Sequence, residues 1–335
     1  MVDSVLVIDL GKTACRAALW SGSHHTDAEG EGAPGLAART GAAGAEAAIL
    51  AVVAPLLRAA GLALVGAVGV GAVGALAAPD AARDLAERLC TSLPARAVAV
   101  MSDAVASHAG ALGGEPGVVL AVGTGAVAIA VGPDGTMHRA DGWGSWLGDE
   151  GGGAWLGLHG LRAAVRTLDG RGPETALQAM AEARFGPLPA FVARLEGHES
   201  PPRLAASFAR DVAHAAQMGD EVAARLLQQA ATALAETVHA AASRLTGPKP
   251  IRLAVVGGLA ALGSIFNVPL LDALGRCTPL IESIAACGTA LDGVRMLALS
   301  VSALHERHVV RVVAPGAKHG ATAKAGGIVM GQVVR

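Results

Sequence analysis

The sequence predicts a duplicated α/β fold whose two halves enclose a cleft. Its 335 residues are too many for one ordinary core and suit two domains. An apolar run, a turn with Gly and a second apolar run join residues 4–9 to 15–20, and the same order joins 117–123 to 126–131. Each copy predicts a strand–turn–strand hairpin that opens an α/β half, and a cleft between such halves is a usual ligand site.

The remaining elements follow from the spacing of apolar residues. Spacings of three and four residues predict helices, and short apolar runs that end at Gly, Pro or Asp predict strands. Helices are expected over 43–60, 80–91, from 104 onward, over most of 154–243 and over 288–304, and strands over 62–70, 96–101 and 252–256. Residues 28–41 predict a loop, and the chain from 309 has β-like pieces without a predicted place.

Small apolar residues dominate the composition and limit what the protein can be. Apolar residues make up 52% of the chain, with 45 Gly and no Tyr, so helices are expected to pack closely against sheets. A net charge of −2 excludes the basic surface that nucleic-acid binding requires. No uninterrupted apolar run reaches membrane-spanning length, and the N-terminus lacks a secretory signal pattern. We therefore expect a cytoplasmic protein without a nucleic-acid or membrane partner.

Neither cysteine nor histidine spacing predicts a metal site. The four cysteines are scattered without a CxxC pair, so we interpret them as small buried apolar residues. His305 and His308 are three residues apart with no third ligand nearby, which we interpret as a solvated helix end.

Two Gly-containing turns are candidate phosphate-binding loops. Gly11, Lys12 and Thr13 follow Asp9, which ends the first strand, and Gly123, Thr124 and Gly125 occupy the matching place in the second hairpin. Glycine lets backbone N–H groups approach a phosphate, Lys12 adds a charge, and Asp9 could hold Mg²⁺ through water. Each turn alone is compatible with an ordinary β-turn, but together they could clamp a polyphosphate from both sides.

Asp103 is the candidate catalytic base. It directly follows the strand predicted over 96–101, and carboxylates at strand ends face the cleft of an α/β sheet. There it could accept the proton of a hydroxyl that attacks a γ-phosphate. The alternative is a helix N-cap formed by Ser102 or Asp103.

Residues 142–157 form the most informative stretch of the chain. They contain seven glycines, the adjacent carboxylates Asp149 and Glu150, and three of the four tryptophans. Such glycine density predicts a tight loop near a ligand, here including Gly144, and the tryptophans argue against a flexible linker. Asp149 and Glu150 are placed to accept hydrogen bonds from sugar hydroxyls. Farther along, Gly257 and Gly258 end a strand and could approach a nucleotide.

A competing motif occurs at 69–74, where Gly69, Gly71 and Gly74 match the dinucleotide-binding pattern GxGxxG. That reading would make the protein an NAD-dependent oxidoreductase. It requires an acidic residue at the end of the next strand, whereas Asp80 and Asp84 come too early. In a chain rich in Ala and Gly the motif also arises by chance.

In order, the segments IDLGKT, SDA, VGTGA, GWGSWLGDEGGG, VVGGL and ACGTALDGVRMLA resemble the BadF/BadG/BcrA/BcrD ATPase family, and most closely its N-acetylglucosamine kinase-like branch. The resemblance spans roughly 4–300, and its most specific part is 124–151. It implies the two-lobed actin-like/sugar kinase/Hsp70 (ribonuclease H-like) fold with a central nucleotide cleft. It also implies the cofactors ATP and Mg²⁺ and a small-molecule sugar substrate.

The resemblance also implies a role for each candidate residue. Asp103 is the base for a sugar 6-hydroxyl, Asp149 is a sugar ligand, the two turns are phosphate loops, and Gly257 and Gly258 lie near the adenosine. It divides the chain into an N-terminal lobe (1–104, completed by a helix at about 288–305) and a C-terminal lobe (105–287). The place of 306–335 and the oligomeric state stay open, with a homodimer among the alternatives.

Two departures from the family pattern bear on the substrate. An Asn that contacts the sugar follows the second phosphate loop in the N-acetylglucosamine kinases, and Val127 stands there in this chain. A second Asn is expected in the loop after the first hairpin, and residues 32–41 contain none. We therefore expect glucosamine rather than N-acetylglucosamine, because a free amine would seek the carboxylates Asp149 and Glu150.

Two further alternatives remain. The family's redox-activator branch holds an iron–sulfur cluster through Cys after the second phosphate loop, and here no Cys lies between Cys90 and Cys277, which argues against that activity. A regulatory ATPase or sensor that binds a sugar without phosphorylating it shares every motif above, and only the reaction product separates it from a kinase.

Overall fold

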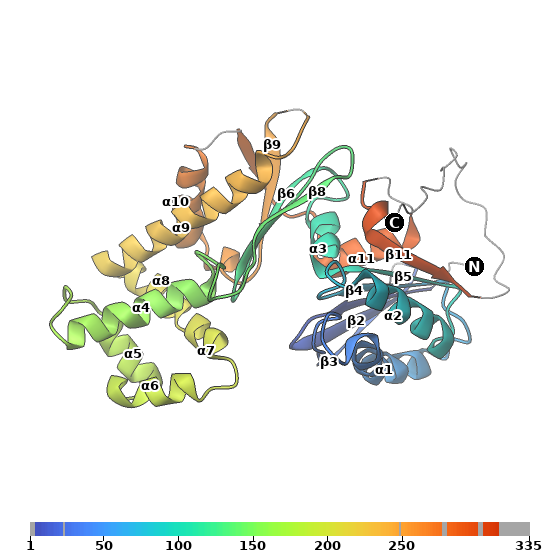
Figure 1. Ribbon diagram of the computed structural model, residues 1–335, viewed down its shortest axis with the longest axis horizontal. Helices are drawn as coiled ribbons and strands as arrows, with labels where there is room; N and C mark the ends of the chain where they lie inside the picture. The colour runs from blue at the N-terminus through green and yellow to red at the C-terminus, as the bar shows by residue number, and fades with distance from the viewer. Residues whose placement is uncertain (1–3, 23, 248, 277–279, 301–303, 315–335) are drawn as a thin grey trace, which may run out of the picture.

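Two α/β lobes make up the computed structural model, which describes residues 4–22, 24–247, 249–276, 280–300 and 304–314 (Figure 1). The strands of the N-terminal lobe are β1 (Val5–Leu10), β2 (Ala14–Ser21), β3 (His24–Glu31), β4 (Ala67–Ala72), β5 (Ala97–Ser102) and β11 (Val309–Val313). They form one sheet in the order β11-β5-β4-β1-β2-β3. The helices of this lobe are α1 (Gly41–Ala60), α2 (Pro79–Ser92), α3 (Asp103–Ala111) and α11 (Ala290–Leu299), with the short 3-10 turn η2 (Glu306–His308).

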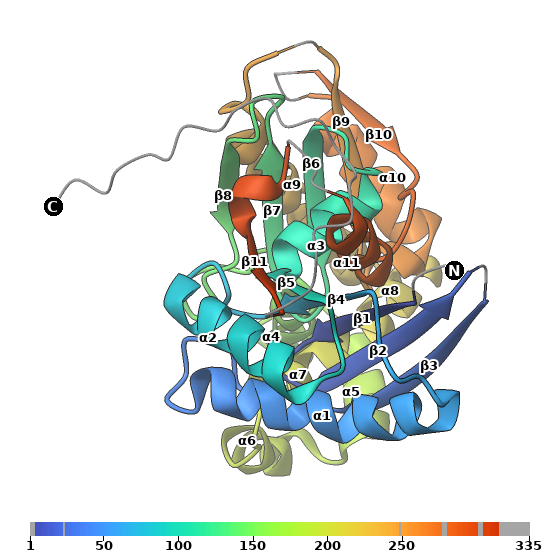
Figure 2. The ribbon, with the colours of Figure 1, turned by 90° about the vertical axis from the view of Figure 1, so that its right-hand side faces the viewer.

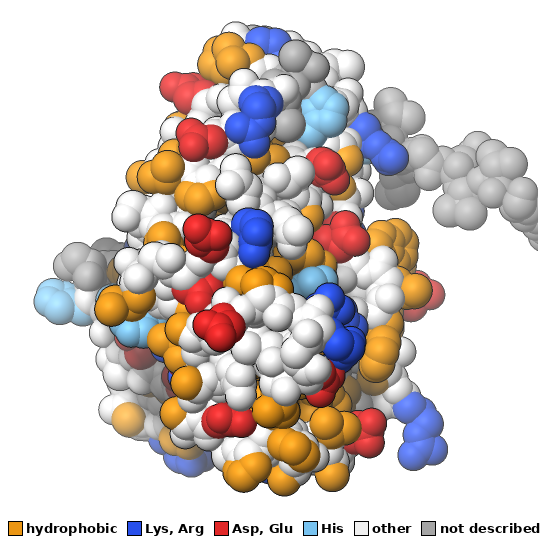
Figure 3. Space-filling model, turned by 90° about the vertical axis from the view of Figure 1, so that its left-hand side faces the viewer, with side chains coloured by type: hydrophobic (Ala, Val, Ile, Leu, Met, Phe, Trp, Pro, Cys, Tyr) orange, Lys and Arg blue, Asp and Glu red, His pale blue; other side chains and the backbone are white. Residues whose placement is uncertain are grey.

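The C-terminal lobe has a second sheet, in the order β10-β9-β6-β7-β8. Its strands are β6 (Gly117–Val122), β7 (Ala126–Val131), β8 (Met137–Asp141), β9 (Ile251–Val256) and β10 (Ile281–Ile284). Its helices are α4 (Gly153–Leu168), α5 (Leu177–Phe185), α6 (Leu188–Glu196), α7 (Pro201–Ser207), α8 (Ala209–Gln217), α9 (Glu221–Ala242) and α10 (Ser264–Leu274), with the 3-10 turn η1 (Ala260–Leu262). On the face that this lobe presents in Figure 3, acidic and basic side chains are interspersed and no broad single-sign patch gathers.

The alternation of β1 determines which side chains face the inter-lobe side. Leu6 and Ile8 pack into the core beneath α1 and α2, while Val5 and Val7 pack on the other face against α3 and α11. Successive side chains of a strand point to opposite faces, so Asp9 shares the face of Val5 and Val7. The sequence pattern of β1 therefore aims Asp9 toward α3.

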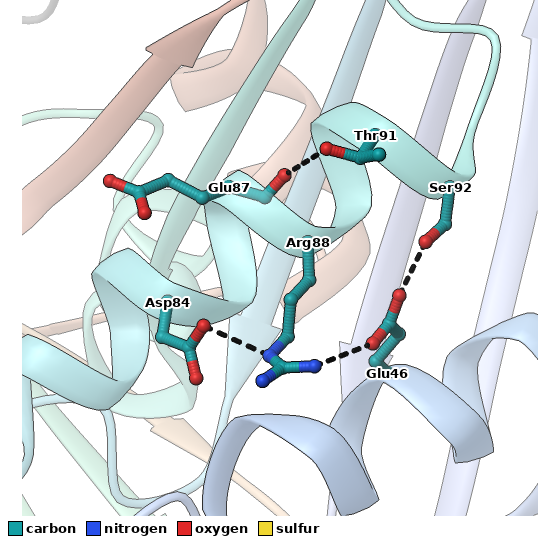
Figure 4. Close-up of polar contacts among 6 residues, drawn as sticks. All are labelled: Glu46, Asp84, Glu87, Arg88, Thr91 and Ser92. Atoms are coloured by element: carbon teal, nitrogen blue, oxygen red, sulfur yellow. Dashed lines mark hydrogen bonds and ion pairs between the residues drawn. The ribbon is translucent and has the colours of Figure 1, made fainter.

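Helix α1 packs on the N-terminal sheet together with α2. By length and composition α1 could cross a membrane, but Ile49 and Val53 are fully buried against the sheet, as in a core helix of this lobe. Arg88 of α2 donates to Asp84 at 2.9 Å and to Glu46 of α1 at 3.4 Å, and Ser92 donates to the same Glu46 (Figure 4). Solvent and salt screen such exposed ion pairs, so the apolar core rather than these contacts holds the two helices together.

Several elements differ from the sequence-based expectation. β3 was predicted as part of a loop from residue 28, because its polar sequence HHTDAEGE lacks apolar alternation and it forms an exposed sheet edge. β10 is another short edge strand that the pattern missed. The helix expected over about 288–305 covers only Ala290–Leu299, since Ser300 is in an extended conformation. The chain beyond it then adds β11 beside β5, antiparallel.

Helices α3 and α11 lie side by side between the lobes (Figure 2). Glycines make this close approach possible: a Cβ at Gly110 would overlap the carbonyl oxygen of Thr289, and one at Gly293 would overlap that of Ala106. The C-terminal end of α3 also packs against the other lobe, where Leu112 contacts a small cluster with Val119 of β6. Helix α3 therefore belongs to both lobes and links their positions.

A buried pair of histidines connects α3 with the segment after α11. The prediction of a solvated helix end at His305 is therefore wrong. His108 Nδ1 lies 3.0 Å from His305 Nε2, and His108 Nε2 lies 3.1 Å from the carbonyl oxygen of Gly117. Because that oxygen only accepts, His108 is protonated on Nε2 and accepts from His305 Nε2–H. His305 Nδ1 is then an unprotonated acceptor, and it has no partner among the described residues. Burial lowers the pKa of both histidines to about 4.

This pair predicts a loss of stability in acid. A free histidine has a pKa near 6.5 and these titrate at about 4, so stability is fully present above about pH 6.5 and is lost as the pH falls toward 4. The first proton on the pair should cost about 3 kcal/mol of unfolding free energy. Urea unfolding of the wild type and of His108→Gln, a neutral donor–acceptor side chain, measures this. Equal pH slopes between 6.5 and 4 in the two proteins would contradict the assignment.

Candidate active site

Asp9 and Asp103 lie at the same edge of the N-terminal sheet. Strands β1, β4 and β5 run parallel, and the register aligns Asp9 with Gly71 and Gly71 with Met101. Asp103 follows β5 and begins α3, where the Ser102 hydroxyl caps the helix by accepting from the N–H of Val105 at 3.1 Å. Ser102 rather than Asp103 therefore caps the helix, so the capping interpretation does not exclude a catalytic role for Asp103.

The surroundings of the two carboxyls favour a proton acceptor. Burial raises the pKa of Asp103, and the N–H of Ala104 and the charges of Lys12 and Arg139 limit the rise. Burial also raises the pKa of Asp9, with the charge of Asp103 adding to the rise and Arg16 opposing it. The structure thus brings Asp9 and Lys12 close enough to Asp103 for their charges to interact with it.

The first candidate phosphate loop is the tight turn between β1 and β2. The N–H of Gly11 donates to the carbonyl oxygen of Ala14 at 2.9 Å, and the Gly11 carbonyl accepts from Ala33 at 3.1 Å. Lys12 and Thr13 are exposed at its tip. The segment after β3 therefore braces this turn and leaves the two side chains free to face a ligand.

The second candidate phosphate loop packs on the start of α4. The first N–H groups of α4 are already used: Gly153 donates to the Gly123 carbonyl and Ala154 to the Thr124 carbonyl, each at 2.8 Å. A Cβ at Gly153 would lie 2.7 Å from the Gly123 oxygen, and one at Gly152 would lie 2.7 Å from the carbonyl carbon of Gly125. Part of the glycine density in 142–157 therefore serves this loop–helix contact.

Asp149 lies in the loop after β8, and hydrogen bonds to the carboxylate of Asp141 hold this loop in place. The Asp149 carboxylate accepts from the N–H groups of Ala126 and Gly144; burial raises its pKa while these bonds oppose the rise. Its own N–H donates to Asp141 Oδ1 at 2.7 Å, and the N–H of Glu150 donates to Asp141 Oδ2 at 3.0 Å. Asp149 has a left-handed φ of 58°, which these bonds maintain.

The sequence-based interpretation missed Asp141 and Arg139. Asp141 immediately precedes the glycine-rich stretch, and nothing in its spacing indicates that it binds N–H groups eight and nine residues later. Arg139 donates to the carbonyl of Asp141 at 2.8 Å and to that of Gly142, and it lies 5.0 Å from the Trp143 ring centre. Its charge lowers the pKa of both Asp103 and Asp149, so it is near enough to act on candidate carboxylates of both lobes.

A hollow of about 650 Å³ opens beside Asp149 and Glu150. Its walls come from the loop after β8, from α4, and from the facing ends of α6 and α7. Trp146, 93% exposed, and Trp155 give it apolar surface, and Glu150 and Glu196 give it carboxylates. Gly144 contributes through its N–H to Asp149 rather than by lining the hollow.

A second hollow, of about 380 Å³, brings together the candidate nucleotide residues of this lobe. Gly123, Thr124 and Gly258 line it from one side, and helices α7 and α8 close the other. Gly257 does not line this hollow; its φ is 106°, and a Cβ there would overlap the carbonyl of Val122. Short helix α7 separates the two hollows: Ala205 lines the larger one beside Asp149, and Ala206 lines the smaller one.

The GxGxxG segment has a packing role. A Cβ at Gly69 would lie 2.6 Å from Val294 Cγ1 and 2.9 Å from Ala298 Cβ, and one at Gly71 would lie 3.1 Å from Val294 Cγ2. These glycines let α11 lie directly on β4. The motif therefore serves helix–sheet contact, and the dinucleotide interpretation loses its support.

Comparison with known proteins places this geometry among sugar kinases. The model of the BadF/BadG/BcrA/BcrD ATPase family matches residues 6–274. An N-acetylmuramic acid/N-acetylglucosamine kinase of Clostridium acetobutylicum is 29% identical over 173 residues. That match covers 48% of this chain and 54% of the relative, so it spans about half the length of that protein.

Solved structures are similar over most of the chain. A protein of Chromobacterium violaceum assigned as an N-acetylglucosamine kinase has a TM-score of 0.66 and 29% identity, covering 88% of this chain and 99% of its own. A ROK family glucokinase of Streptomyces griseus, solved with glucose and AMPPNP, has a TM-score of 0.56 and 19% identity over 88% of this chain and 99% of its own. These likenesses confirm the predicted two-lobed actin-like sugar kinase fold.

Proposed function

The chain belongs to the BadF/BadG/BcrA/BcrD ATPase family, and from this premise we propose that it is an ATP-dependent hexosamine kinase acting on the 6-hydroxyl of glucosamine. The observation that carries the proposal is that helix α7 separates two hollows of the C-terminal lobe. A glycine-lined hollow at Thr124 and Gly258 suits a nucleotide, and a carboxylate-lined hollow at Asp149 suits a sugar. The charge of Arg139 acts on both Asp103 and Asp149, which supports a position of Asp103 near the carboxylate-lined hollow.

In this mechanism Asp103 is the general base. Its carboxylate takes the proton of the 6-hydroxyl as that oxygen attacks the γ-phosphorus, the bond from phosphorus to the β–γ bridging oxygen breaks, and ADP leaves. The raised pKa of Asp103 makes it a stronger base than an ordinary aspartate, and the charges of Lys12 and Arg139 limit the rise by favouring the ionised form. The turn at Gly11–Thr13 and the loop at Gly123–Gly125 would hold the phosphates from opposite lobes.

Asp9 would hold Mg²⁺ together with the nucleotide phosphates, and the ion would neutralise phosphate charge. The fit rests on Asp9's carboxyl, half-buried at the strand end beside the second negative charge of Asp103, which favours a bound cation. Among the described residues no three His, Cys, Asp or Glu side chains gather into a metal cage. That agrees with Mg²⁺, which is usually bound by one or two carboxylates plus substrate phosphates. We also propose a cytoplasmic location, because the proposed reaction consumes ATP.

The acceptor is inferred from the groups around the sugar loop. Val127 lies opposite Asp141 in the β7–β8 register. Its side chain packs against the start of the sugar loop, since a Cβ on Gly142 would lie 2.9 Å from Val127 Cγ2. An apolar side chain there offers no partner to an acetamide, whereas Asp149 and Glu150 offer carboxylates to an ammonium group. N-acetylglucosamine is the second candidate, favoured by the names of the Clostridium and Chromobacterium relatives.

Coupled ADP release with Mg-ATP tests the acceptor. We expect kcat/KM for glucosamine to exceed that for N-acetylglucosamine by at least about tenfold, which is the value of one lost polar contact. Glucose and a reaction without sugar are the controls. A preference for the N-acetyl sugar would overturn the assignment of glucosamine, and sugar-independent ADP release would favour a sensor ATPase.

A further inference from the structure

The smaller hollow carries a positive charge that the family motifs do not account for. Of the side chains that line it, those of Arg184, Arg203 and Arg210 face the glycines of the second phosphate loop, and no acidic side chain lines it. Arg184 is neutralised, since its Nε lies 2.7 Å from Asp211 Oδ2. Arg203 and Arg210 are exposed, and within the described part of the chain neither side chain makes a hydrogen bond or ion pair; the backbone N–H of Arg203 donates to Ser200. Two unpaired guanidinium groups therefore remain.

An anion in this hollow would need side-chain donors. The N–H groups of Gly153 and Ala154 already donate to loop carbonyls, and the N–H of Gly123 donates to Gly125 at 2.9 Å. The start of α4 therefore has few free donors to offer a phosphate group there. On the opposite lobe, Lys12 is the cation of the first phosphate turn.

We propose that Arg203 and Arg210 bind the α- and β-phosphates of the nucleotide, an assignment that rests on the proposed function. The guanidinium group is planar and always charged, and it pairs with phosphate oxygens through two parallel hydrogen bonds. Arg203 on α7 and Arg210 on α8 approach the hollow from two helices, opposite Thr124 and Gly258. A diphosphate between these two walls would lie against Thr124 and Gly258 on one side and meet the two guanidinium groups on the other.

Calorimetric titration of the wild type, Arg203→Ala and Arg210→Ala with ADP and with adenosine tests the assignment. We expect each substitution to weaken ADP binding at least about tenfold and to leave adenosine binding within about twofold. The double variant should also lose much of the salt dependence of ADP binding. Arg225→Ala, on the exposed side of α9 and outside the hollow, is the matched control. Because all three arginines are exposed, melting temperatures should stay close to the wild type.

The possible results of these titrations distinguish a failure of the arginine assignment from a failure of the proposed function. ADP binding that stays at the wild-type level in both variants would overturn the arginine assignment and leave the kinase proposal standing. An equal loss for ADP and adenosine would also overturn it, because it would indicate a contact to the base rather than to phosphate. Failure of the wild type to bind either ligand would instead overturn the proposed function, and this assignment with it.

Discussion

Replacing Asp103 by Asn should reduce kcat by about 10³-fold or more while leaving the Kd for ADP within about twofold. Asparagine keeps the oxygen that accepts from the N–H of Ala104 at 2.9 Å, and the Ser102 cap of α3 is independent of residue 103. The variant should therefore fold normally and lose only the proton acceptor. Steady-state kinetics with Mg-ATP and glucosamine, together with ADP titration, measure both quantities.

The pH profile gives the same prediction a second readout. The base works only when ionised, so kcat falls as the pH drops through the pKa of Asp103, which burial raises above the ordinary aspartate value. This acidic limb should be absent from the residual activity of the Asn variant. Asp134→Asn, an exposed turn carboxylate that bonds Thr136, is the control and should behave like the wild type. Wild-type turnover by Asp103→Asn would remove Asp103 from this role.

Replacing Gly293 by Ala should destabilise the protein by about 3 kcal/mol or more, an overpacking effect at the upper end of the usual range. The new methyl group would overlap the Ala106 carbonyl of α3, a backbone atom that no side-chain rotation can move away. Helices α11 and α3 must then separate, which also displaces Asp103 at the start of α3. The unfolding free energy, measured in urea, and kcat should therefore both fall.

Gly275→Ala is the matched comparison for this substitution. Gly275 ends α10 with a φ of −63°, and its added Cβ would be 3.5 Å from the nearest atom, an ordinary contact. We expect its unfolding free energy to stay within about 0.5 kcal/mol of the wild type. Equal stability of the two Ala variants would show that the α3–α11 crossing is looser than the structure indicates.

The sequence was informative where local chemistry and period determine the structure. The two hairpins gave β1–β2 and β6–β7, and the ends of apolar strands gave the positions of Asp9 and Asp103. Edge strands escaped because β3 has no buried face to impose alternation and β10 spans only four residues. The GxGxxG motif was not informative, because the sequence does not distinguish a glycine needed for helix packing, such as Gly69, from one that approaches a ligand.

The candidate site was predicted in part for the same reason. Gly-containing turns and strand-end carboxylates have local signals, whereas Asp141 acts through N–H groups of Asp149 and Glu150 that only the folded loop brings to it. Arg203 and Arg210 lie in a helical region without a motif, and their relevance depends on two helices facing a loop about eighty residues earlier. The buried pair of His108 and His305 joins positions 197 residues apart, a contact that no spacing rule reveals.

The most direct test of the account is ³¹P NMR of the products that the purified protein forms from Mg-ATP and glucosamine. We predict ADP and one phosphomonoester signal in equal amounts, with the phosphorus coupled to the two protons on carbon 6. In the same reaction time the Asp103→Asn variant should form about 10³-fold less of the phosphomonoester. Inorganic phosphate as the sole new phosphorus species besides ADP, in the same amount with and without sugar, would contradict phosphoryl transfer to a sugar.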